Sequence, residues 1–543
     1  MSKVAKTTIG LMIATLIAKV LGFGRELTLA GVYGTQGISD VFKISMTIPV
    51  VIFAAVGTSL DTAFIPLYQE VLKNNGEKEA NKFTNNVLNT VILICMAFSI
   101  LGLIFTPQIV HVFAMGFKGE IFAQTVYFTR IMIIGLAFLG MSYIMTAYLQ
   151  VKGNFVIPGL MSVPNNIIVI TSIVLSSIIS IHLLPWGALI GLFLQFLFQL
   201  PFAKKRGFKY SLFVNFNDKY LRKMLWLVIP VLIGVAVNQV STIVDRTIAS
   251  NLAEGSISAL DYAAKLNSFV MGMFIVSISS VVYPLLAKLT TQNNKEEFYK
   301  AIKASVNTVI LLLIPISIGA MILATPIVKV LFQRGAFDAK STQMTAIAVV
   351  FYSIGIIGFG LRDILGKVFY SLQDTTTPMV NGIITIVLNI VLNLLFVRYT
   401  NMQHAGLAFA TSISAIVTII LLFISLRKKI GPFGGKSIII VLIKSIISAL
   451  LMAVVTLFVY NFLNEAVPAL LDGVLPDLLH KILPAALEKK LTAEKVYDII
   501  SLGGSVGCGA LTYGICIILL KVDEVNLILN NIKNKIKEIE KLS

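Results

Sequence analysis

Five ionisable side chains cluster early in the chain, and their types suit the binding of an anion. Lys19, Arg25, Glu26, Asp40 and Lys43 lie between two long apolar runs. A charged residue at membrane depth is costly and usually faces the interior of a helix bundle or a water-filled cavity. Arginine and lysine recognise phosphate, and arginine can do so through two parallel hydrogen bonds. The alternative is a short external loop whose charges are solvated.

The composition indicates a polytopic membrane protein. Of 543 residues, 57% are hydrophobic and 13% are charged, whereas soluble domains contain about a quarter charged residues. The net charge of +18 favours cytoplasmic loops that contact anionic lipid, and no nucleic-acid-binding motif is visible. The three cysteines have neither metal-ligand spacing nor the pattern of a disulfide framework.

A membrane-spanning helix needs about 20 mainly apolar residues, and many segments of this chain meet that length. We expect fourteen spans, at residues 7–24, 39–65, 86–106, 122–150, 156–181, 183–203, 221–250, 257–287, 302–325, 341–370, 378–398, 404–426, 437–462 and 498–520. The first span has no small-residue cleavage site after it, so we expect a retained helix and not a signal peptide. The predicted fold class is an all-α membrane protein with 14 transmembrane helices.

Lysine and arginine concentrate in alternate loops, which predicts the orientation. The basic loops are residues 73–82, 204–209, 288–300 and 427–436, and both chain ends fall on their side. Because cytoplasmic loops carry the excess of basic residues, we expect both termini in the cytoplasm. Residues 463–497 would then form a long external loop, and the tail after Lys521 would form an amphipathic cytoplasmic helix.

The chain repeats itself at an interval of about 220 residues. Residues 59–67 resemble residues 277–285, and Leu149-Gln150 resembles Leu372-Gln373. Six expected helices separate equivalent positions, so the two halves are parallel repeats. We therefore expect three parts: residues 1–206 as an N-lobe with helices 1–6, residues 207–430 as a C-lobe with helices 7–12, and residues 431–543 with helices 13 and 14.

The repeat predicts a central cavity with charged residues from both lobes. Lys19, Arg25 and Lys43 come from the first lobe, and Arg246, Lys265 and Arg362 come from the second. Part of this charge is balanced by Asp40, Asp245, Asp261 and Asp363. A net cationic cavity within low-dielectric walls attracts anions, and arginine clusters suit a pyrophosphate. The alternative is that these residues form internal ion pairs.

Several blocks of sequence resemble one family of membrane transporters. Among them are Leu21-Gly-Phe-Gly-Arg-Glu26, Ser39-Asp-Val-Phe42 and Gln373-Asp-Thr-Thr-Thr-Pro378. They resemble the MurJ (MviN) lipid II flippases of the multidrug/oligosaccharidyl-lipid/polysaccharide exporter superfamily. The resemblance implies two lobes in a V and alternating access. It also implies transport of an undecaprenyl-pyrophosphate-linked peptidoglycan precursor across the bacterial cytoplasmic membrane, from the inner to the outer leaflet, without an enzymatic step or a required cofactor.

The resemblance assigns roles to individual positions. Arg25, Glu26 and Asp40 match charged residues of the family's first two helices, and Lys265 matches a basic residue of its eighth. The family usually has an arginine a few residues after the helix-2 proline, but Pro49 is followed here by Val-Val-Ile-Phe. Lys43, about two turns before that proline, is the candidate substitute.

Some members of the family bind sodium in the second lobe, and the resemblance implies the same site here. Its ligands would be Asp245, Asn389, Asn393, the Leu407 carbonyl and Thr411. Residues four apart share one face of a helix, so the two asparagines present their amide oxygens together. Hard cations prefer oxygen ligands. Hydrogen bonding between helices is the alternative role for the asparagines.

Three other functions fit parts of the sequence. A flippase for another polyprenyl-pyrophosphate-linked oligosaccharide fits the same charges, and the sequence does not separate it from a lipid II flippase. A multidrug antiporter of the same superfamily would favour an acidic cavity over a basic one. A membrane-embedded glycosyltransferase would need a compact acid–base or metal constellation, which the sequence does not contain.

Overall fold

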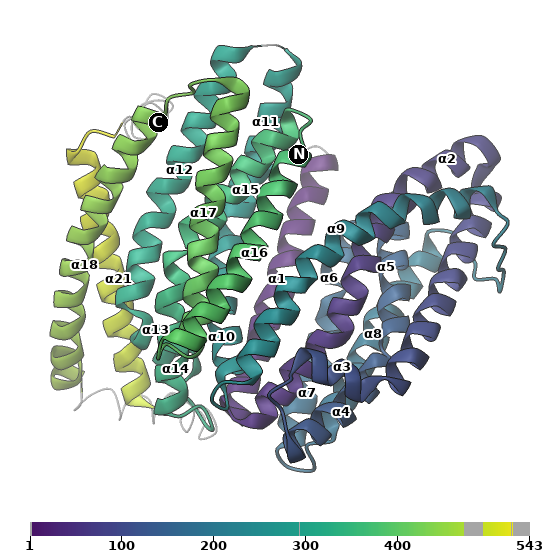
Figure 1. The fold of residues 1–543 in the computed structure, drawn as a ribbon, viewed down its shortest axis with the longest axis horizontal. Helices are drawn as coiled ribbons and strands as arrows, with labels where there is room; N and C mark the ends of the chain where they lie inside the picture. The colour runs from purple at the N-terminus through teal and green to yellow at the C-terminus, as the bar shows by residue number, and fades with distance from the viewer. Residues whose placement is uncertain (1–2, 293, 472–491, 523, 525–543) are drawn as a thin grey trace, which may run out of the picture. The chain divides into compact units, whose positions relative to one another are not determined.

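All regular elements of the described chain are helices, as the composition and hydropathy predict. The computed structural model describes residues 3–292, 294–471, 492–522 and 524 (Figure 1). Its contacts divide the chain into two compact units. Unit 1 comprises Met1–Ser258 and Arg334–Ser341, and unit 2 comprises Ala259–Gln333 and Thr342–Ser543.

Unit 1 is built on one very long helical element, α2, which turns back at Gly76. There the backbone leaves the helical region (φ 79°, ψ 178°), so α2 consists of two successive helices. The helices of this unit are α1 (Lys3–Tyr33), α2 (Gly37–Ile104), α3 (Thr106–Phe113), α4 (Gly119–Ile133), α5 (Leu136–Val151), α6 (Val156–Leu160), α7 (Ser162–Ser176), α8 (Leu183–Lys205) and α9 (Lys219–Ser250). A left-handed φ is accessible to glycine at little cost, which explains the position of this turn.

The core of unit 1 lies mainly between α2 and α5 and is rich in aromatic side chains. The ring centroids of Tyr68 and Tyr148 lie 5.8 Å apart in an edge-to-face arrangement. Phe64 and Phe83, from the two halves of α2, stack with centroids 5.7 Å apart. The Phe64–Phe83 contact holds the two halves of α2 together, and the Tyr68–Tyr148 contact joins α2 to α5.

Unit 2 contains the remaining helices and a single π-helical turn. Its elements are α10 (Ser256–Val270), η1 (Met271–Ile275), α11 (Val276–Thr291), α12 (Lys295–Ile322), α13 (Ala324–Phe332), α14 (Ala339–Ile354), α15 (Ile356–Ser371), α16 (Thr376–Tyr399), α17 (His404–Ile430), α18 (Gly435–Leu471) and α21 (Ala493–Leu519). The first residues of α10 and α14 belong to unit 1. A second apolar core, with buried side chains from α11, α12, α15, α17 and α18, stabilises this unit.

The helices account for the expected membrane spans. By length and hydropathy, the described residues contain 11 candidate spans, or 12 if the bent pair α14 and α15 forms one span. The other two expected segments are covered by α1 and α9.

The structure differs from the sequence-based expectation around the last two spans. The helix expected to end near residue 462 continues to Leu471, and α21 begins at Ala493. Hydrophobicity marks only the part of a helix that lies in lipid, so a helix that continues into water is cut short by such a prediction. Within the expected loop 463–497, residues 472–491 lie outside the described residues. The expected amphipathic tail also lies outside them, apart from Val522 and Glu524.

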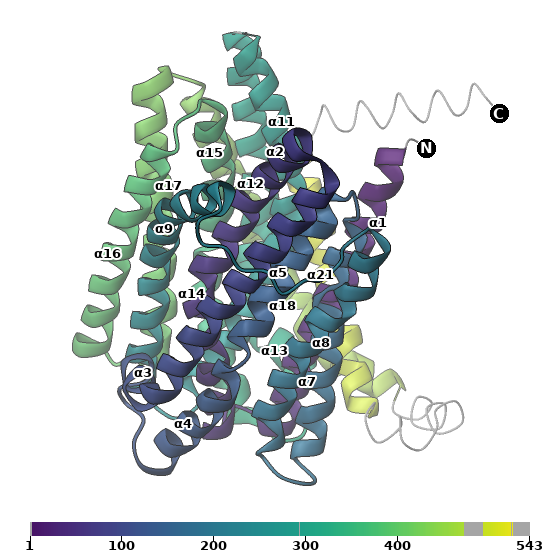
Figure 2. The ribbon, with the colours of Figure 1, turned by 90° about the vertical axis from the view of Figure 1, so that its right-hand side faces the viewer.

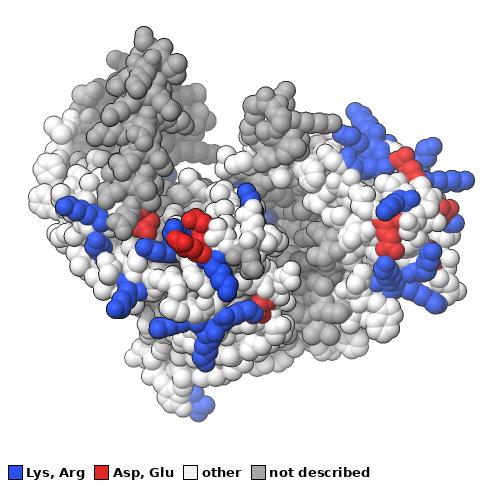
Figure 3. Space-filling model, turned by 90° about the horizontal axis from the view of Figure 1, so that it is seen from above, with Lys and Arg blue, Asp and Glu red and all other residues white. Residues whose placement is uncertain are grey.

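Basic side chains gather at the ends of helices in unit 1. The loop after α8 lies against the turn region of α2, where Asn81 donates to the Gly207 carbonyl at 3.1 Å and Lys223 pairs with Glu70 at 2.7 Å. Lysines from both segments therefore share one surface. Figure 3 shows Lys and Arg outnumbering Asp and Glu on the face that it views.

The packing of α15 against α17 in unit 2 gives a first testable prediction. A Cβ atom added to Gly358 would lie 2.8 Å from the carbonyl carbon of Ala415, whereas one added to Gly366 would meet no atom within 4 Å. Small residues allow helix backbones to approach closely in membranes. We expect Gly358→Ala to destabilise the protein by about 1–3 kcal/mol through overpacking. Thermal unfolding in detergent measures the effect, and Gly366→Ala on the same helix is the control. Equal unfolding temperatures of the two variants would contradict the prediction.

Candidate functional site

A tight turn between α1 and α2 brings Arg25 and Lys43 together. α1 ends at Tyr33 and α2 begins at Gly37, so the chain reverses within three residues. The turn contains Gly34 at φ +58°, where a side chain would overlap the backbone of a neighbouring segment. The last part of α1 therefore lies beside the first part of α2.

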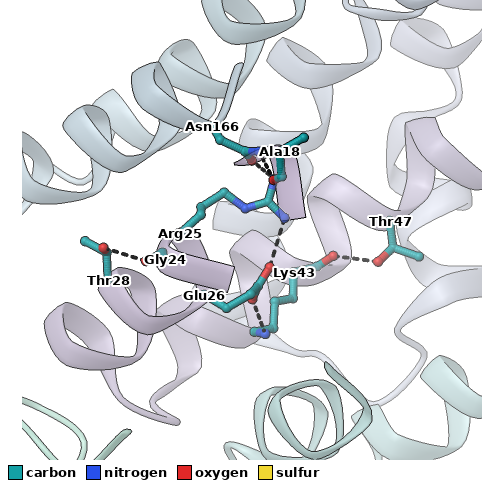
Figure 4. Close-up of polar contacts among 8 residues, drawn as sticks. All are labelled: Ala18, Gly24, Arg25, Glu26, Thr28, Lys43, Thr47 and Asn166. Atoms are coloured by element: carbon teal, nitrogen blue, oxygen red, sulfur yellow. Dashed lines mark hydrogen bonds and ion pairs between the residues drawn. The ribbon is translucent and has the colours of Figure 1, made fainter. Parts of the chain in front are cut away.

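Glu26 bridges the two cations. Its Oε1 lies 2.9 Å from Arg25 Nη2, and its Oε2 lies 3.2 Å from Lys43 Nζ (Figure 4). The side chains of Glu26 and Lys43 are 8% and 4% exposed, and that of Arg25 is 18% exposed. Lys43 also interacts electrostatically with Asp40, so its charge is compensated within the protein. Arg25 is the more exposed of the two cations and is the one that an anion can contact.

Asn166 of α7 holds the guanidinium of Arg25 from the other side. Arg25 Nη1 donates to Asn166 Oδ1 at 3.3 Å, and Asn166 Nδ2 donates to the Ala18 carbonyl at 3.5 Å (Figure 4). A guanidinium has five N–H groups. Within the described residues Arg25 uses two of them, on Glu26 and Asn166, and the rest are available to a ligand. The guanidinium is thus oriented by two fixed partners before any ligand arrives.

Asp40 lies on α2, and its contacts are with the start of α10. Its Oδ2 accepts the Gly255 N–H at 2.9 Å, and its Oδ1 accepts the N–H and the hydroxyl of Ser258 at 2.8 and 2.5 Å. Because α10 begins at Ser256, the carboxylate caps the N-terminus of that helix, where the helix dipole favours negative charge. Asp40 is 3% exposed. Its expected part in substrate binding stays a prediction.

The other expected cations are more accessible than Lys43. In unit 1, Lys19 is exposed on α1 and Arg246 is half-buried on α9. In unit 2, Lys265 on α10 and Arg362 on α15 are exposed. Each unit therefore carries basic side chains that are at least partly accessible to an anion.

Arg362 and Asp363 point to different partners, as expected for neighbours on a helix. The guanidinium carbon of Arg362 lies 5.6 Å from the ring centroid of Phe359, and Asp363 accepts a hydrogen bond from the Ser279 hydroxyl. The adjacent residues Arg25 and Glu26 do pair, because the long arginine side chain can fold back along the helix. Of these two pairs of adjacent residues, Arg25 and Glu26 form an ion pair with each other, whereas Arg362 and Asp363 contact other residues.

Four of the five expected sodium ligands lie together in unit 2. Asn389 donates to Thr411 Oγ1 at 3.3 Å, Asn393 donates to Asn389 Oδ1 at 3.2 Å, and Thr411 donates to the Leu407 carbonyl at 2.9 Å. Asp245 is half-buried in unit 1. Hard cations prefer oxygen ligands, and this group offers amide, hydroxyl and carbonyl oxygens. No cluster of three or more His, Cys, Asp or Glu side chains suited to a metal occurs in the described residues.

Sequence reasoning missed the residues that hold the charged side chains in place. Asn166 lies within an otherwise apolar stretch of α7, and nothing in its neighbourhood signals a link to Arg25. Gly255 and Ser258 belong to a segment that repeats Gly37 and Ser39, and this likeness was a usable signal. A repeat shows which positions correspond, but it does not show that Asp40 of one repeat caps the helix of the other.

Comparisons with known proteins connect this arrangement to one family. The family model described as lipid II flippase MurJ matches residues 29–471. A probable lipid II flippase MurJ of Buchnera aphidicola subsp. Acyrthosiphon pisum is 32% identical over 424 residues, which cover 77% of this chain and 82% of the relative. A lipid II flippase MurJ of Burkholderia cenocepacia is 29% identical over 427 residues, which cover 76% and 82%.

Solved structures show the same fold. A lipid II flippase MurJ in an inward closed conformation matches with a TM-score of 0.76 and 25% identity, covering 95% of this chain and 100% of the other. An inward-facing multidrug resistance transporter of the MATE family matches with a TM-score of 0.64 and 13% identity, covering 79% and 99%. At that identity the second match shows the fold alone.

The cap that Asp40 provides gives a second testable prediction. In Asp40→Ala, the buried N–H groups of Gly255 and Ser258 lose their acceptor, and each unsatisfied buried group costs about 1–3 kcal/mol. We expect a clear fall in the thermal unfolding temperature of the purified protein. Glu120→Ala removes an exposed carboxylate from the first turn of α4 and is the control. An unfolding temperature of Asp40→Ala that equals the control's would show that the cap contributes nothing to stability.

Proposed function

The chain belongs to the MurJ family of lipid II flippases, and we propose that it moves lipid II from the inner to the outer leaflet of the membrane. Lipid II is a peptidoglycan precursor linked to undecaprenyl pyrophosphate, so the protein would serve peptidoglycan biosynthesis and cell-wall growth. The observation that carries the proposal is Arg25, a cation held by Glu26 and Asn166 with N–H groups available for an anion.

The charge of the cargo determines which groups the protein must provide. A pyrophosphate with a large polar headgroup cannot cross hydrocarbon alone, because a buried charge without a partner is very costly. Arg25 can bind a phosphate group through two parallel hydrogen bonds. Lys43 lies behind Glu26 and acts as a positioning residue, since its ammonium holds the carboxylate that orients Arg25. The transport involves no covalent step.

We further propose that the remaining cations complete the substrate site. Lys19 and Arg246 in unit 1, and Lys265 and Arg362 in unit 2, are at least partly accessible and would contact the pyrophosphate or the sugars as the cargo moves. The family's arginine after the helix-2 proline is absent here. The positive charge that Arg25 and Lys43 share around Glu26 is the proposed replacement.

Alternating access is the proposed mechanism. Each unit has its own buried core, so each can move as a body without unfolding. We place the protein in the bacterial cytoplasmic membrane with both termini in the cytoplasm, since the basic loops lie on the same side as the chain ends. The resemblance to multidrug transporters rests on 13% identity, and the basic cluster at Arg25 is the wrong charge for a cationic drug.

Replacement of Arg25 tests the proposed function. Hydrogen bonds to charged groups contribute about 1.5–3 kcal/mol, so Arg25→Ala should weaken lipid II binding about tenfold or more and abolish growth support. Arg25→Lys should restore activity in part, because lysine keeps the charge but lacks the planar fork. Rescue of a bacterium depleted of its own lipid II flippase measures activity. Arg130→Ala is the control, because Arg130 is an exposed residue in the last turn of α4. Full rescue by Arg25→Ala would overturn the assigned role.

The proposed sodium site has its own test. An ion that binds only the folded protein raises the unfolding temperature as its concentration rises. We expect stabilisation by sodium, and much less by potassium, and we expect Asn389→Ala and Asp245→Ala to remove it. Asn381→Ala is the control, since Asn381 is buried on the same helix as Asn389 and donates to Ser425 at 3.4 Å instead. The same sodium response in Asn389→Ala and in the control would remove this site.

A further inference from the structure

The connection between α8 and α9 in unit 1 is an irregular segment bound along α2 by asparagine side chains. Residues 207–217 form no helix and no strand. Four asparagines on the second half of α2 donate to the backbone of this segment: Asn81, Asn85, Asn86 and Asn89. Figure 2 shows the connection crossing the side of α2 that faces the viewer. We call residues 207–217 the α8–α9 segment.

The asparagines bind the segment as a neighbouring β-strand would. Asn85 accepts the Ser211 N–H at 2.9 Å and donates to the Lys209 carbonyl at 2.8 Å. Asn86 makes the same pair of bonds with Asn215, at 2.7 and 3.0 Å. An amide side chain offers both a donor and an acceptor, so it can satisfy a peptide group on its own. The backbone of the segment is thereby partly satisfied without water.

Asn89 fixes the middle of the segment against the second half of α2. Its Nδ2 donates to the carbonyls of Ser211 and Phe213, both at 3.0 Å, so Leu212 lies at the height of Asn89 on α2. Asn89 lies three residues into the span expected at residues 86–106, so the segment runs beside the start of that span. Irregular backbone next to a membrane needs its polar groups satisfied, which is the role of the asparagines.

Every second side chain of the segment is large, apolar and accessible. Leu212 is 85% exposed, Tyr210 is 56%, Phe216 is 55% and Val214 is 37%. Single exposed apolar residues are ordinary on a protein surface, but four in one short segment mark an interaction site. Phe208, at the start of the segment, is buried against Tyr148 and holds the segment to the unit 1 core.

Basic side chains surround the apolar ones. Between residues 202 and 223 the chain has seven Lys or Arg residues and one acidic residue, Asp218. The Nζ atom of Lys82 on α2 lies 5.1 Å from the ring centroid of Phe213, so this cation lies over the segment. Basic residues at the membrane surface attract anionic lipids, each contributing roughly 1 kcal/mol near that surface. A segment that combines these charges with exposed apolar groups matches the boundary between headgroups and acyl chains.

We propose that the α8–α9 segment anchors unit 1 in the membrane leaflet next to the basic loops. Tyr210, Leu212, Val214 and Phe216 enter the boundary between headgroups and acyl chains, and the neighbouring Lys and Arg side chains bind the phosphates of anionic phospholipids. The position of the segment beside the start of an expected span and the surplus of positive charge favour lipid over an added protein strand as the occupant. The anchor uses none of the residues of the Arg25 site, so a test of the anchor does not depend on which cargo the protein moves.

Bromine quenching of tryptophan fluorescence tests the anchor. The full chain carries Trp186→Phe, Trp226→Phe and Leu212→Trp and is reconstituted into phosphatidylglycerol vesicles with brominated acyl chains. We expect strong quenching by the lipid and weak quenching by aqueous iodide. Asn74→Trp in the same background is the control, because Asn74 is an exposed residue of α2 close to the turn at Gly76. It should show the opposite pattern. Phe216→Trp provides a second probe if the first variant folds poorly.

Two outcomes would overturn the proposal. A tryptophan at 212 or 216 that iodide reaches and brominated lipid does not would place the segment in water and favour a protein partner. Equal quenching in phosphatidylcholine and phosphatidylglycerol vesicles, unaffected by Lys205→Gln and Lys209→Gln, would exclude the anionic lipid. We expect these two substitutions to reduce the difference between the two lipids and to leave Asn74→Trp unchanged.

Discussion

An ionised side chain cannot remain in hydrocarbon without compensation, and unit 1 is organised around that constraint. Glu26 lies between Arg25 and Lys43, so three charges are held at an energetic cost far below that of three separate ones. Asp40 is compensated in another way, by the N-terminal N–H groups of α10. The first arrangement leaves the Arg25 guanidinium with N–H groups open to a ligand, while the second is closed. Only the first can receive an anionic cargo without displacing a structural contact.

The same constraint explains which other polar groups lie at depth. The asparagines of α2 satisfy the backbone of the α8–α9 segment, and Asn166 both orients Arg25 and bonds to α1. In unit 2, hydrogen bonds link Asn393 to Asn389 and Asn389 to Thr411. Interhelical hydrogen bonds of this kind contribute about 0.6–2 kcal/mol each in membranes, enough to fix helix positions without making them rigid. A transporter needs such a balance, because its helices must hold a polar cargo and still move.

The sequence predicted the helices well, because hydropathy measures directly what a span requires. It also singled out Arg25, Glu26 and Lys43 as a group, since charges in an apolar surrounding are conspicuous. It did not predict Asn166, Gly255 or Ser258 as their partners, because hydrogen bonds between distant segments leave no local pattern. The extension of α18 to Leu471 was missed for another reason: the helix outlasts the apolar stretch that marks it. The alternative of internal ion pairing applies to Arg25, whose side chain is long enough to reach Glu26.

If the protein is a lipid II flippase, lipid II must reach the outer leaflet through this chain. The most direct measurement is the access of an externally added, lipid II-cleaving enzyme to lipid II in bacteria that lack their own flippase. Expression of this chain should raise the cleaved fraction to the level seen with the host's flippase, and Arg130→Ala should match it. The account would be contradicted if lipid II remained protected while the chain was present in the membrane at normal levels.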